Sequence, residues 1–292
     1  MPTEAGIWWL ASYPKSGNTW LRAFLSALLS GRPVDINDMP FVGMSADARV
    51  PFDETLGIDS ADLSPKQVTN LRPRAYEVWA TDATRPVHCK VHDAYHLTPA
   101  GEPLFPTAAT RGAVYVVRDP RAVAVSFAHY VAQSIDETIA WMDHPAAMLG
   151  NFPQRLSQRL PARLLRWSAH VESWLAAPFP VHLVRYEDMS ADPHATFTEL
   201  AAFLGLPSDR ETIASAVAAT TFSRLQAQER EAGFVEKPNS ARAFFREGKT
   251  DGWRRSLTPK NAERIVASHG ALMRRLGYDE TLAPLNVERE NA

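Results

Sequence analysis

Four short runs of the chain are almost continuously apolar and end in polar residues. They are GIWWLAS (6–12), PVHCKVH (86–92), GAVYVVRDP (112–120) and FPVHLVRYED (179–188). Short apolar runs bounded by turn residues are typical of buried β-strands. Segments between and after them repeat apolar residues at helical spacing, as residues 20–28 do. Strands that alternate with helices predict an α/β fold, a parallel β-sheet flanked by helices on both faces, in a single domain over 1–292.

Two long segments show neither the apolar runs of strands nor the helical spacing of apolar residues. Residues 32–65 are rich in Pro, Asp and Gly, and residues 226–253 are polar with no clear period. Long irregular segments inside compact domains are usually functional or flexible. We therefore expect 32–65 to be partly mobile and to gate access to a site, and 226–253 to form a loop that covers it.

The overall charge bears on the class of ligand. The 292 residues carry 31 Lys and Arg against 33 Asp and Glu, a net charge of −2. No global field attracts nucleic acid or an anionic membrane, so any anion site must be a local cluster of positive charge. The single cysteine, Cys89, excludes an internal disulfide, and no apolar stretch reaches membrane-spanning length. These features predict a cytoplasmic protein that binds neither nucleic acid nor membrane.

Polar residues directly after the first predicted strand resemble a phosphate-binding turn. Lys15, Ser16, Gly17, Asn18 and Thr19 lead into the first helix. The N-terminus of a helix offers free N–H groups and the positive end of the helix dipole, and Lys15 adds a full charge. The Gly-Lys-Ser/Thr order of an ordinary P-loop is missing. A plain capped turn with a solvated lysine is the alternative.

Two further strand ends also carry candidate chemistry. Lys90 and His92 share one side of the second strand, where a histidine could act as a general base. Arg118 ends the third strand, and Ser126 follows about two helical turns later, a combination that suits a second phosphate. Taken singly, His92 is better explained as a surface or hydrogen-bonded histidine, and Arg118 as the partner of an aspartate in a surface ion pair.

Six motifs in this order resemble the cytosolic-type sulfotransferases and bacterial sulfotransferases that act on natural products. The motifs are YPKSGNTW (13–20), KVH (90–92), VVRDPRAVAVSFAHY (116–130), RYEDM (185–189), TTFSRL (220–225) and FFREGKTDGW (244–253). The resemblance implies a P-loop-like sheet and a donor, 3′-phosphoadenosine 5′-phosphosulfate (PAPS). The product would be adenosine 3′,5′-bisphosphate (PAP), with no metal required. The sulfuryl group would pass directly, in line, to a hydroxyl or amine.

The resemblance also implies roles for individual residues. His92 would be the general base, and Lys15 and Lys90 would stabilise charge on the leaving phosphate and on the transferring group. The implied cofactor-binding residues are Lys15, Ser16, Gly17, Asn18, Thr19, Trp20, Arg118, Ser126, Tyr186, Thr220, Phe222, Leu225, Phe245, Arg246, Glu247 and Gly248. Trp20 and Phe222 would hold the adenine between them.

Some positions depart from the family pattern. Glu247 stands where lysine is usual, and a carboxylate there repels a phosphate unless it points away or pairs with Lys249. A short dimer motif is partly kept by Arg254, Thr258 and Glu263, which leaves a homodimer open.

The acceptor is the least determined part of the sequence. We expect a small-molecule phenol or alcohol in a pocket lined by Phe24, Phe41, Trp79, His92, Tyr95, Phe127 and His129. An equally good interpretation places most of these aromatic residues in the core. Two other functions would use the same fold: a small P-loop kinase or NTPase, and a non-catalytic nucleotide-binding protein.

Overall fold

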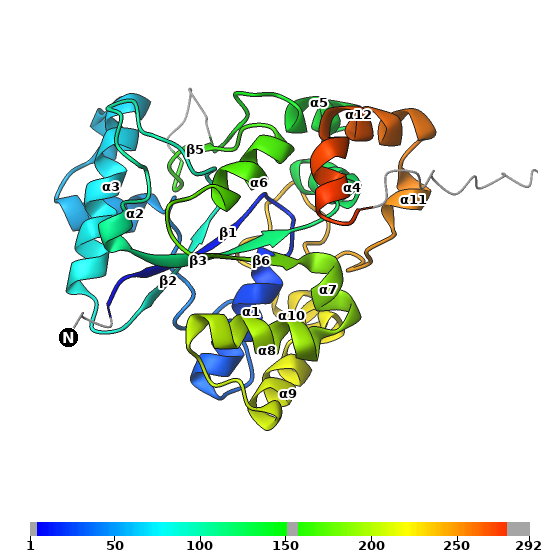
Figure 1. Ribbon diagram of the computed structural model, residues 1–292, viewed down its shortest axis with the longest axis horizontal. Helices are drawn as coiled ribbons and strands as arrows, with labels where there is room; N and C mark the ends of the chain where they lie inside the picture. The colour runs from blue at the N-terminus through cyan, green and yellow to red at the C-terminus, as the bar shows by residue number, and fades with distance from the viewer. Residues whose placement is uncertain (1–4, 151–156, 279–292) are drawn as a thin grey trace, which may run out of the picture.

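A four-stranded parallel sheet forms the centre of the protein. The computed structural model describes residues 5–150 and 157–278. The strands are β1 (Ile7–Ser12), β2 (Val87–Val91), β3 (Thr110–Val117) and β6 (Val181–Arg185), in the order β2-β1-β3-β6. Figure 1 shows this sheet crossing the middle of the molecule. The four predicted strands and the α/β class are therefore confirmed. A small antiparallel pair, β4 (Met148–Leu149) and β5 (Ala162–Arg163), lies apart from the sheet.

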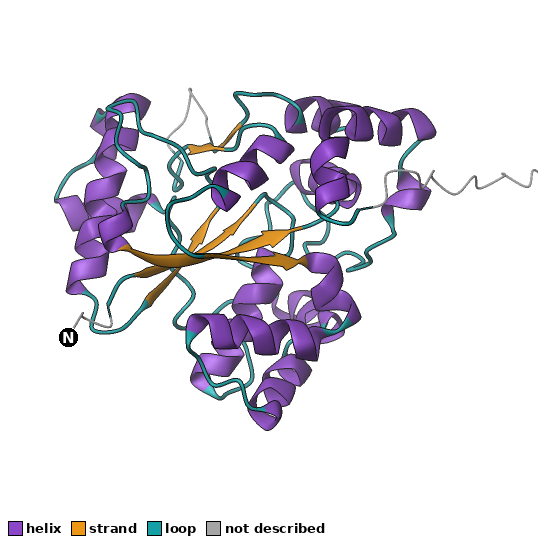
Figure 2. Ribbon diagram, viewed as in Figure 1, coloured by secondary structure: helices purple, strands orange, loops and turns teal. Residues whose placement is uncertain are grey.

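Helices cover both faces of the sheet, as predicted (Figure 2). One layer contains α2 (Arg49–Leu56), α3 (Pro65–Asp82), α4 (Pro120–Val131), α5 (Ile135–Met142), α6 (Trp167–Leu175), α11 (Trp253–Ser256) and α12 (Pro259–Arg275). The other contains α1 (Asn18–Ser30), α7 (Tyr186–Ala191), α8 (Pro193–Leu204), α9 (Arg210–Ala219) and α10 (Phe222–Ala232). Two short 3₁₀ turns, η1 (Ser60–Asp62) and η2 (Thr107–Ala109), complete the described elements.

Side chains that alternate along the strands contribute to two separate hydrophobic cores. Trp9 and Tyr115 point into the layer of α3, α4 and α6. Leu10 and Val114 point into the layer of α1 and α8. All four side chains are fully buried. Because successive residues face opposite sides, a strand covered on both faces must be apolar throughout, which is the pattern that the sequence displays.

Both segments expected to be irregular contain a helix. Residues 32–65 include α2, and residues 226–253 begin within α10. Each helix was missed because it buries few side chains: Phe52 alone is buried in α2, and Leu225 and Glu229 in α10. An amphipathic period cannot be detected from one or two inward positions. The remainder of 226–253, up to α11, is irregular as predicted.

The outer edge of β2 is paired with residues of the 32–65 segment. The Lys90 N–H donates to the Met44 carbonyl at 2.9 Å, and the Ala46 N–H donates to the Lys90 carbonyl at 2.9 Å. Both backbone hydrogen-bonding groups of Lys90 are therefore used by this short extension, while β2 pairs with β1 along its other edge.

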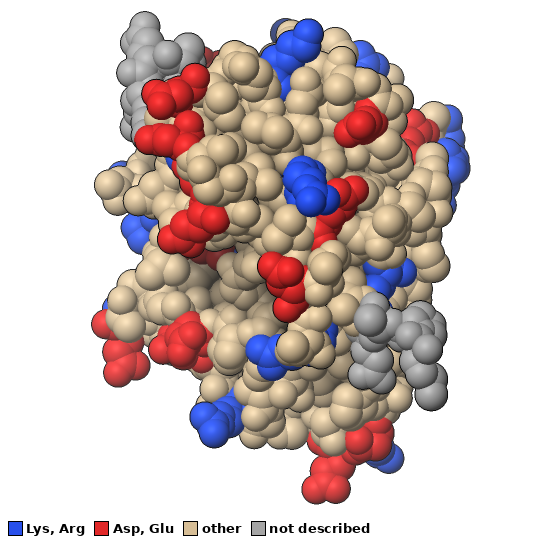
Figure 3. All heavy atoms as spheres, turned by 90° about the vertical axis from the view of Figure 1, so that its left-hand side faces the viewer, with Lys and Arg blue, Asp and Glu red and all other residues tan. Residues whose placement is uncertain are grey.

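The surface carries charges of both signs. On the face with α2 and α3, the coloured basic side chains stand singly, with acidic side chains between them (Figure 3). Among the helices described, none has the length and apolar content needed to cross a bilayer.

Candidate functional site

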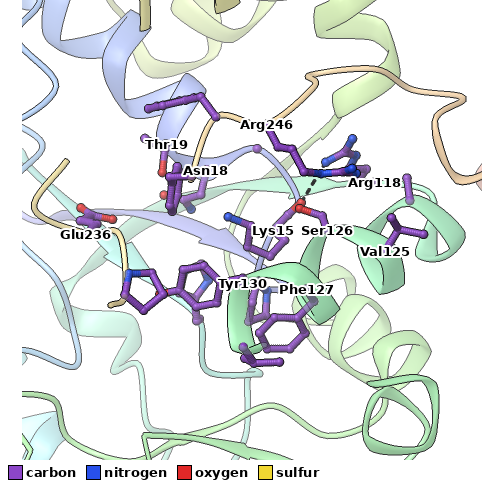
Figure 4. Close-up of a pocket in the computed structure, with 18 of the residues that line it drawn as sticks. Lys15, Asn18, Thr19, Arg118, Val125, Ser126, Phe127, Tyr130, Glu236 and Arg246 are labelled. Carbon is purple, nitrogen blue, oxygen red and sulfur yellow. Dashed lines mark hydrogen bonds between the residues drawn. The ribbon is translucent and has the colours of Figure 1, made fainter. Parts of the chain in front are cut away.

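The carboxyl ends of the strands open into a cavity of about 750 Å³, which is the size expected for a small-molecule site. Figure 4 shows Lys15 in its centre, with Arg118, Ser126 and Arg246 on one side and Glu236 on the other. The predicted catalytic residues Lys15, Lys90 and His92 all line it. So do the following predicted cofactor residues: Gly17, Asn18, Thr19, Trp20, Arg118, Ser126, Tyr186, Phe222, Leu225, Phe245, Arg246, Glu247 and Gly248.

The turn after β1 has the backbone shape of an anion cradle. Lys15 and Gly17 both have positive φ, 67° and 110°, and α1 begins immediately afterwards at Asn18. A Cβ on Gly17 would lie 2.6 Å from Cδ2 of Tyr186, so glycine is required by space as well as by conformation. The Ser16 hydroxyl is buried and has no hydrogen-bond partner among the described residues. A built turn with an unused donor at a helix N-terminus fits an anionic ligand.

Lys15 is held over two aromatic rings. Its Nζ lies 3.6 Å from the ring centre of Phe244 and 4.5 Å from that of Tyr130. Burial lowers the pKa of Lys15 to about 7, and the charges of Arg118 and Lys90 act in the same direction. A bound anion would reverse this effect, so the lysine is poised to gain a proton together with a ligand.

His92 is fixed in one tautomer. Its Nδ1 lies 2.9 Å from the Ser12 carbonyl oxygen. A carbonyl can only accept, so in the neutral ring Nδ1 carries the proton and Nε2 keeps its lone pair. Burial, with the charge of Lys90 acting in the same direction, lowers the pKa of His92 to about 3. At neutral pH the ring is therefore uncharged and Nε2 keeps its lone pair.

Hydrogen bonds from His170 and Tyr115 hold the main chain of His92 in place. Nε2 of His170 donates to the His92 carbonyl at 3.0 Å, and the Tyr115 hydroxyl donates to Nδ1 of His170 at 2.7 Å. The main chain of His92 is thus anchored to α6 and β3.

The arginine at the end of β3 joins three segments. Nη1 of Arg118 donates to the Lys15 carbonyl at 3.3 Å, and its Nη2 to the Lys249 carbonyl at 2.9 Å. Its guanidinium carbon lies 4.1 Å from the ring centre of Tyr186. Its buried Nε has no partner among the described residues. This donor set suits a phosphate at that end of the cavity.

The charge of Glu247 is compensated by Arg246 in its own loop and by Arg255 on α11. Its carboxylate lies 2.8 Å from Arg246 and 3.9 Å from Arg255. The expected alternatives were that it points away or pairs with Lys249. It lines the cavity and pairs with these two arginines instead, so its charge is compensated where it stands.

Ser16 and Thr220, which the resemblance assigned to cofactor binding, do not line the cavity. Ser16 is buried beneath the turn, and the Thr220 hydroxyl donates to the Ala216 carbonyl at 2.8 Å. In this structure Thr220 serves to end α9.

Most of the predicted acceptor residues lie elsewhere. Phe24 stacks on Phe197 with ring centres 3.9 Å apart, in the core on the α1 side. Trp79 and Tyr95 belong to the opposite core. Phe41 is exposed beside Arg85, and His129 does not line the cavity. For Phe24, Trp79 and Tyr95, the core interpretation left open by the sequence is the one observed.

A further wall of the cavity is lined by residues that the sequence reasoning missed. Tyr130 and Val131 join the predicted Phe127 on α4, and Trp141, Met148, Leu149 and Arg159 complete this wall. The spacing of Phe127, Tyr130 and Val131 is i, i+3, i+4, so the helical period could have found them. His129 lies between them in sequence and therefore points in another direction.

Glu236 is a further residue that sequence reasoning did not identify. Its carboxylate lines the cavity and bonds Nζ of Lys90 at 2.7 Å and Nη1 of Arg22 at 2.6 Å. It lies in the irregular part of 226–253 and belongs to none of the six motifs. Across residues 5–150 and 157–278, no group of three acidic, histidine or cysteine side chains could hold a metal ion.

Comparison with known proteins decides the family. Residues 7–277 match the model of the sulfotransferase domain. The chain belongs to the sulfotransferase family. The resemblance seen in the sequence, and the enzyme class that it implied, are thereby confirmed.

Relatives of this sulfotransferase include plant and animal enzymes. Flavonol 3-sulfotransferase of Flaveria bidentis is 25% identical over 277 residues, covering 88% of this chain and 78% of the relative. Sulfotransferase 1A1 of Bos taurus is 25% identical over 273 residues, which cover 90% of this chain and 82% of the relative.

Solved structures agree with the fold. Retinol dehydratase in complex with retinol and PAP has a TM-score of 0.59 at 18% identity, covering 94% of this chain and 83% of that one. Mouse sulfotransferase SULT7A1 complexed with PAP has a TM-score of 0.57 at 18% identity, covering 93% and 85%. At this identity the likeness concerns the fold, a P-loop-like sheet in a single domain.

Proposed function

We propose that this sulfotransferase transfers a sulfuryl group from PAPS directly to the hydroxyl, or amine, of a small-molecule acceptor, with His92 as general base. The observation that carries the proposal is the arrangement of His92: a neutral ring with Nδ1 held by Ser12 and Nε2 left as the basic atom. It lines the same cavity as Lys15 and Lys90.

The residues present fit PAPS. Lys15 lies at the centre of the cavity, and Arg118 and Arg246 place positive charge on one side of it. Trp20, Phe222 and Leu225 line the cavity and offer apolar surface for an adenine. The two PAP-bound neighbours share this fold, which supports the same choice.

Each side chain then has a definite task. When bound, PAPS supplies the sulfuryl group and a phosphate leaving group. Nε2 of His92 takes the proton of the acceptor hydroxyl. The Lys15 ammonium compensates the negative charge that develops on the 5′ side, and Lys90 stabilises charge on the sulfuryl oxygens. Catalysis rests on positioning and electrostatics, and no metal is required.

The acceptor that fits best is a phenol or another apolar alcohol. Phe127, Tyr130, Trp141 and Leu149 form a largely aromatic wall near His92. The names of the plant relatives, which include a flavonol 3-sulfotransferase and a flavonol 4′-sulfotransferase, support a phenolic hydroxyl. We also propose a cytoplasmic location, as for the relatives named cytosolic sulfotransferases. We propose residues 32–65 as the segment that gates the acceptor and residues 226–253 as the cover of the cofactor, and a homodimer through 254–263 stays a prediction.

Ligand binding measured by calorimetry tests the cofactor. PAP should bind tightly and equally well with and without Mg²⁺, and ATP should bind weakly under both conditions. A preference for ATP with Mg²⁺ would instead indicate the kinase or NTPase function, and the PAPS assignment would be abandoned.

A further inference from the structure

A carboxylate touches the proposed catalytic lysine inside the cavity. Oε2 of Glu236 lies 2.7 Å from Nζ of Lys90, and its Oε1 lies 2.6 Å from Nη1 of Arg22. The side chains are 17%, 8% and 3% exposed for Glu236, Lys90 and Arg22. An ion pair this secluded is screened little by solvent, so the charge state of each member depends on the others.

The backbone around Glu236 is fastened to the other end of the chain. Nδ2 of Asn37 donates to the Gly233 carbonyl at 3.1 Å, and the Val235 N–H donates to Oδ1 of Asn37 at 2.9 Å. Phe234, between them, is 6% exposed and packs edge-on against Phe244. These contacts fix the carboxylate as a part of the fold rather than as the tip of a swinging flap.

The electrostatic surroundings explain why Lys90 needs such a partner. Burial lowers the pKa of Lys90, the charges of Arg22 and Arg159 lower it further, and Glu236 raises it. Burial alone would raise the pKa of Glu236, but Lys90 and Arg22 hold it well below its usual range. The charged and titratable groups around Lys90 are Glu236, Arg22, Arg159, Lys15, His92 and Asp47. Asp47 is engaged by Arg159 at 3.1 Å, which leaves Glu236 as the acid in contact with Lys90.

We propose that Glu236 is a positioning residue that holds the Lys90 side chain at the acceptor end of the cavity and keeps it as an ammonium ion during transfer. The proposal rests on the proposed function, in which Lys90 must be charged. Glu236 acts through Lys90 and takes no proton from the acceptor. In an alternative role, the Glu236 carboxylate would occupy the position of the sulfuryl group in the free protein, and PAPS would have to displace it. The fastened backbone of 233–235 argues against that role.

The test compares Glu236→Gln with Glu231→Gln, an exposed glutamate in the same segment that undergoes the same chemical change. Acetic anhydride labels neutral amines, so labelling of Lys90 across pH, measured by peptide mass spectrometry, reports its protonation without any acceptor. In Glu236→Gln, Lys90 should become reactive at a pH lower by a unit or more. In Glu231→Gln and in Glu236→Asp, which keeps the carboxylate, labelling should stay near the wild-type profile.

Turnover provides a second measurement, with PAPS and 2-naphthol as the acceptor probe. Because activity requires charged Lys90, the alkaline limb of the rate profile should move to lower pH in Glu236→Gln. The maximal rate should fall roughly 10- to 100-fold, as for loss of a hydrogen bond to a charged group. Affinity for PAP should change by less than about threefold, because the residue acts on Lys90 and not on the cofactor.

Three results would overturn the proposal. One is an unchanged labelling profile in Glu236→Gln. Another is tighter PAP binding with faster transfer, which would identify the carboxylate as a competing anion. The third needs only the wild type: Lys90 labelled in full below pH 7.5 would mean that Glu236 does not keep it charged. Failure of the proposed function looks different, because PAP would then bind to neither protein while the labelling shift could still be seen.

Discussion

The Tyr186 hydroxyl donates a hydrogen bond of 2.9 Å to the carbonyl of Gly248, a residue 62 positions further along the chain. The ring of Tyr186 also closes over the phosphate turn, where a Cβ on Gly17 would collide with it. One side chain, directly after β6, therefore links the two loops that we propose to hold the ends of the cofactor.

Removing only this hydroxyl tests the link. In Tyr186→Phe the ring still covers Gly17, but the Gly248 carbonyl loses its donor. Because the variant loses one net hydrogen bond, its affinity for PAP should fall roughly 2- to 10-fold. Calorimetry measures this affinity. Tyr95→Phe, in the core away from the cavity, is the control and should bind as the wild type does. Equal affinity in both variants would show that the bond does not position the loop.

The shape of the phosphate turn can be tested at its glycine. Gly17→Ala combines a positive φ with a Cβ 2.6 Å from Tyr186, so both stability and PAP binding should fall. Gly31→Ala is matched, because Gly31 also has positive φ but its Cβ would meet nothing within 4 Å. Backbone strain alone costs about 1–2 kcal/mol. Thermal unfolding should show that cost in both variants and a larger loss in Gly17→Ala, with PAP binding lost in that variant alone.

The lowered pKa of Lys15 predicts proton uptake on binding. With a pKa of about 7, Lys15 is mostly neutral at pH 8 in the free protein, and a phosphate beside it raises that pKa. Binding of PAP at pH 8 should therefore take up close to one proton, measured by calorimetry in buffers of different ionisation enthalpy. Lys15→Arg, which is always charged, should bind PAP without that uptake. Uptake of similar size in both proteins would assign the proton to another group.

The proposed base can be separated from cofactor binding. His92→Ala should lower the transfer rate roughly 10²- to 10⁴-fold, as expected for loss of a general base. Affinity for PAP should stay within a few-fold of the wild type, because the proposed role of Nε2 is toward the acceptor and not toward the cofactor. His194→Ala, at an exposed histidine, is the control. Loss of PAP binding in His92→Ala would mean that the residue holds the cofactor.

Buried histidines predict sensitivity to acid. Burial lowers the pKa of His88, His170 and His269 to about 4 and that of His92 to about 3. Between pH 6.5 and about 4 the unfolded chain therefore binds more protons than the folded one, and stability must fall as the pH falls. Each such histidine contributes a slope of roughly 1.4 kcal/mol per pH unit in that window.

Urea unfolding across this range measures the slope. His88 offers the test variant, because neither of its ring nitrogens has a hydrogen-bond partner among the described residues. In His88→Leu, the slope of the free energy of unfolding against pH should decrease by the amount that corresponds to about one proton. An unchanged slope would show that His88 is already neutral in the unfolded chain or stays charged in the folded one.

The sequence contained most of the information about the strands and the cofactor end of the site. Continuous apolar runs are required when a strand is buried on both faces, so Trp8 and Trp9 could be assigned to a strand although they enter different cores. Lys15 and Arg118 could be placed together because the ends of parallel strands meet at one edge of the sheet.

The acceptor end could not be predicted in the same way. An aromatic residue such as Phe24 is equally suitable for a core and for the lining of a pocket. Only the contact with Phe197, which is distant in the sequence, shows that Phe24 belongs to the core. Glu236 depends on an ion pair with Lys90, 146 positions away, and no local spacing encodes such a contact. Helices α2 and α10 bury too few side chains to show a period.

The pairing of residues 44–46 with β2 has a consequence for how the acceptor range could be altered. The main chain of Lys90 is bonded to Met44 and Ala46. A change in this segment would therefore disturb the lysine and slow turnover, although none of the described residues 32–65 lines the cavity. Tyr130 and Val131 line the same cavity from α4, whose backbone is independent of that strand. Substitutions on α4 can thus alter selectivity without disturbing Lys90, whereas a change in the β2 extension acts on the speed of transfer through that lysine.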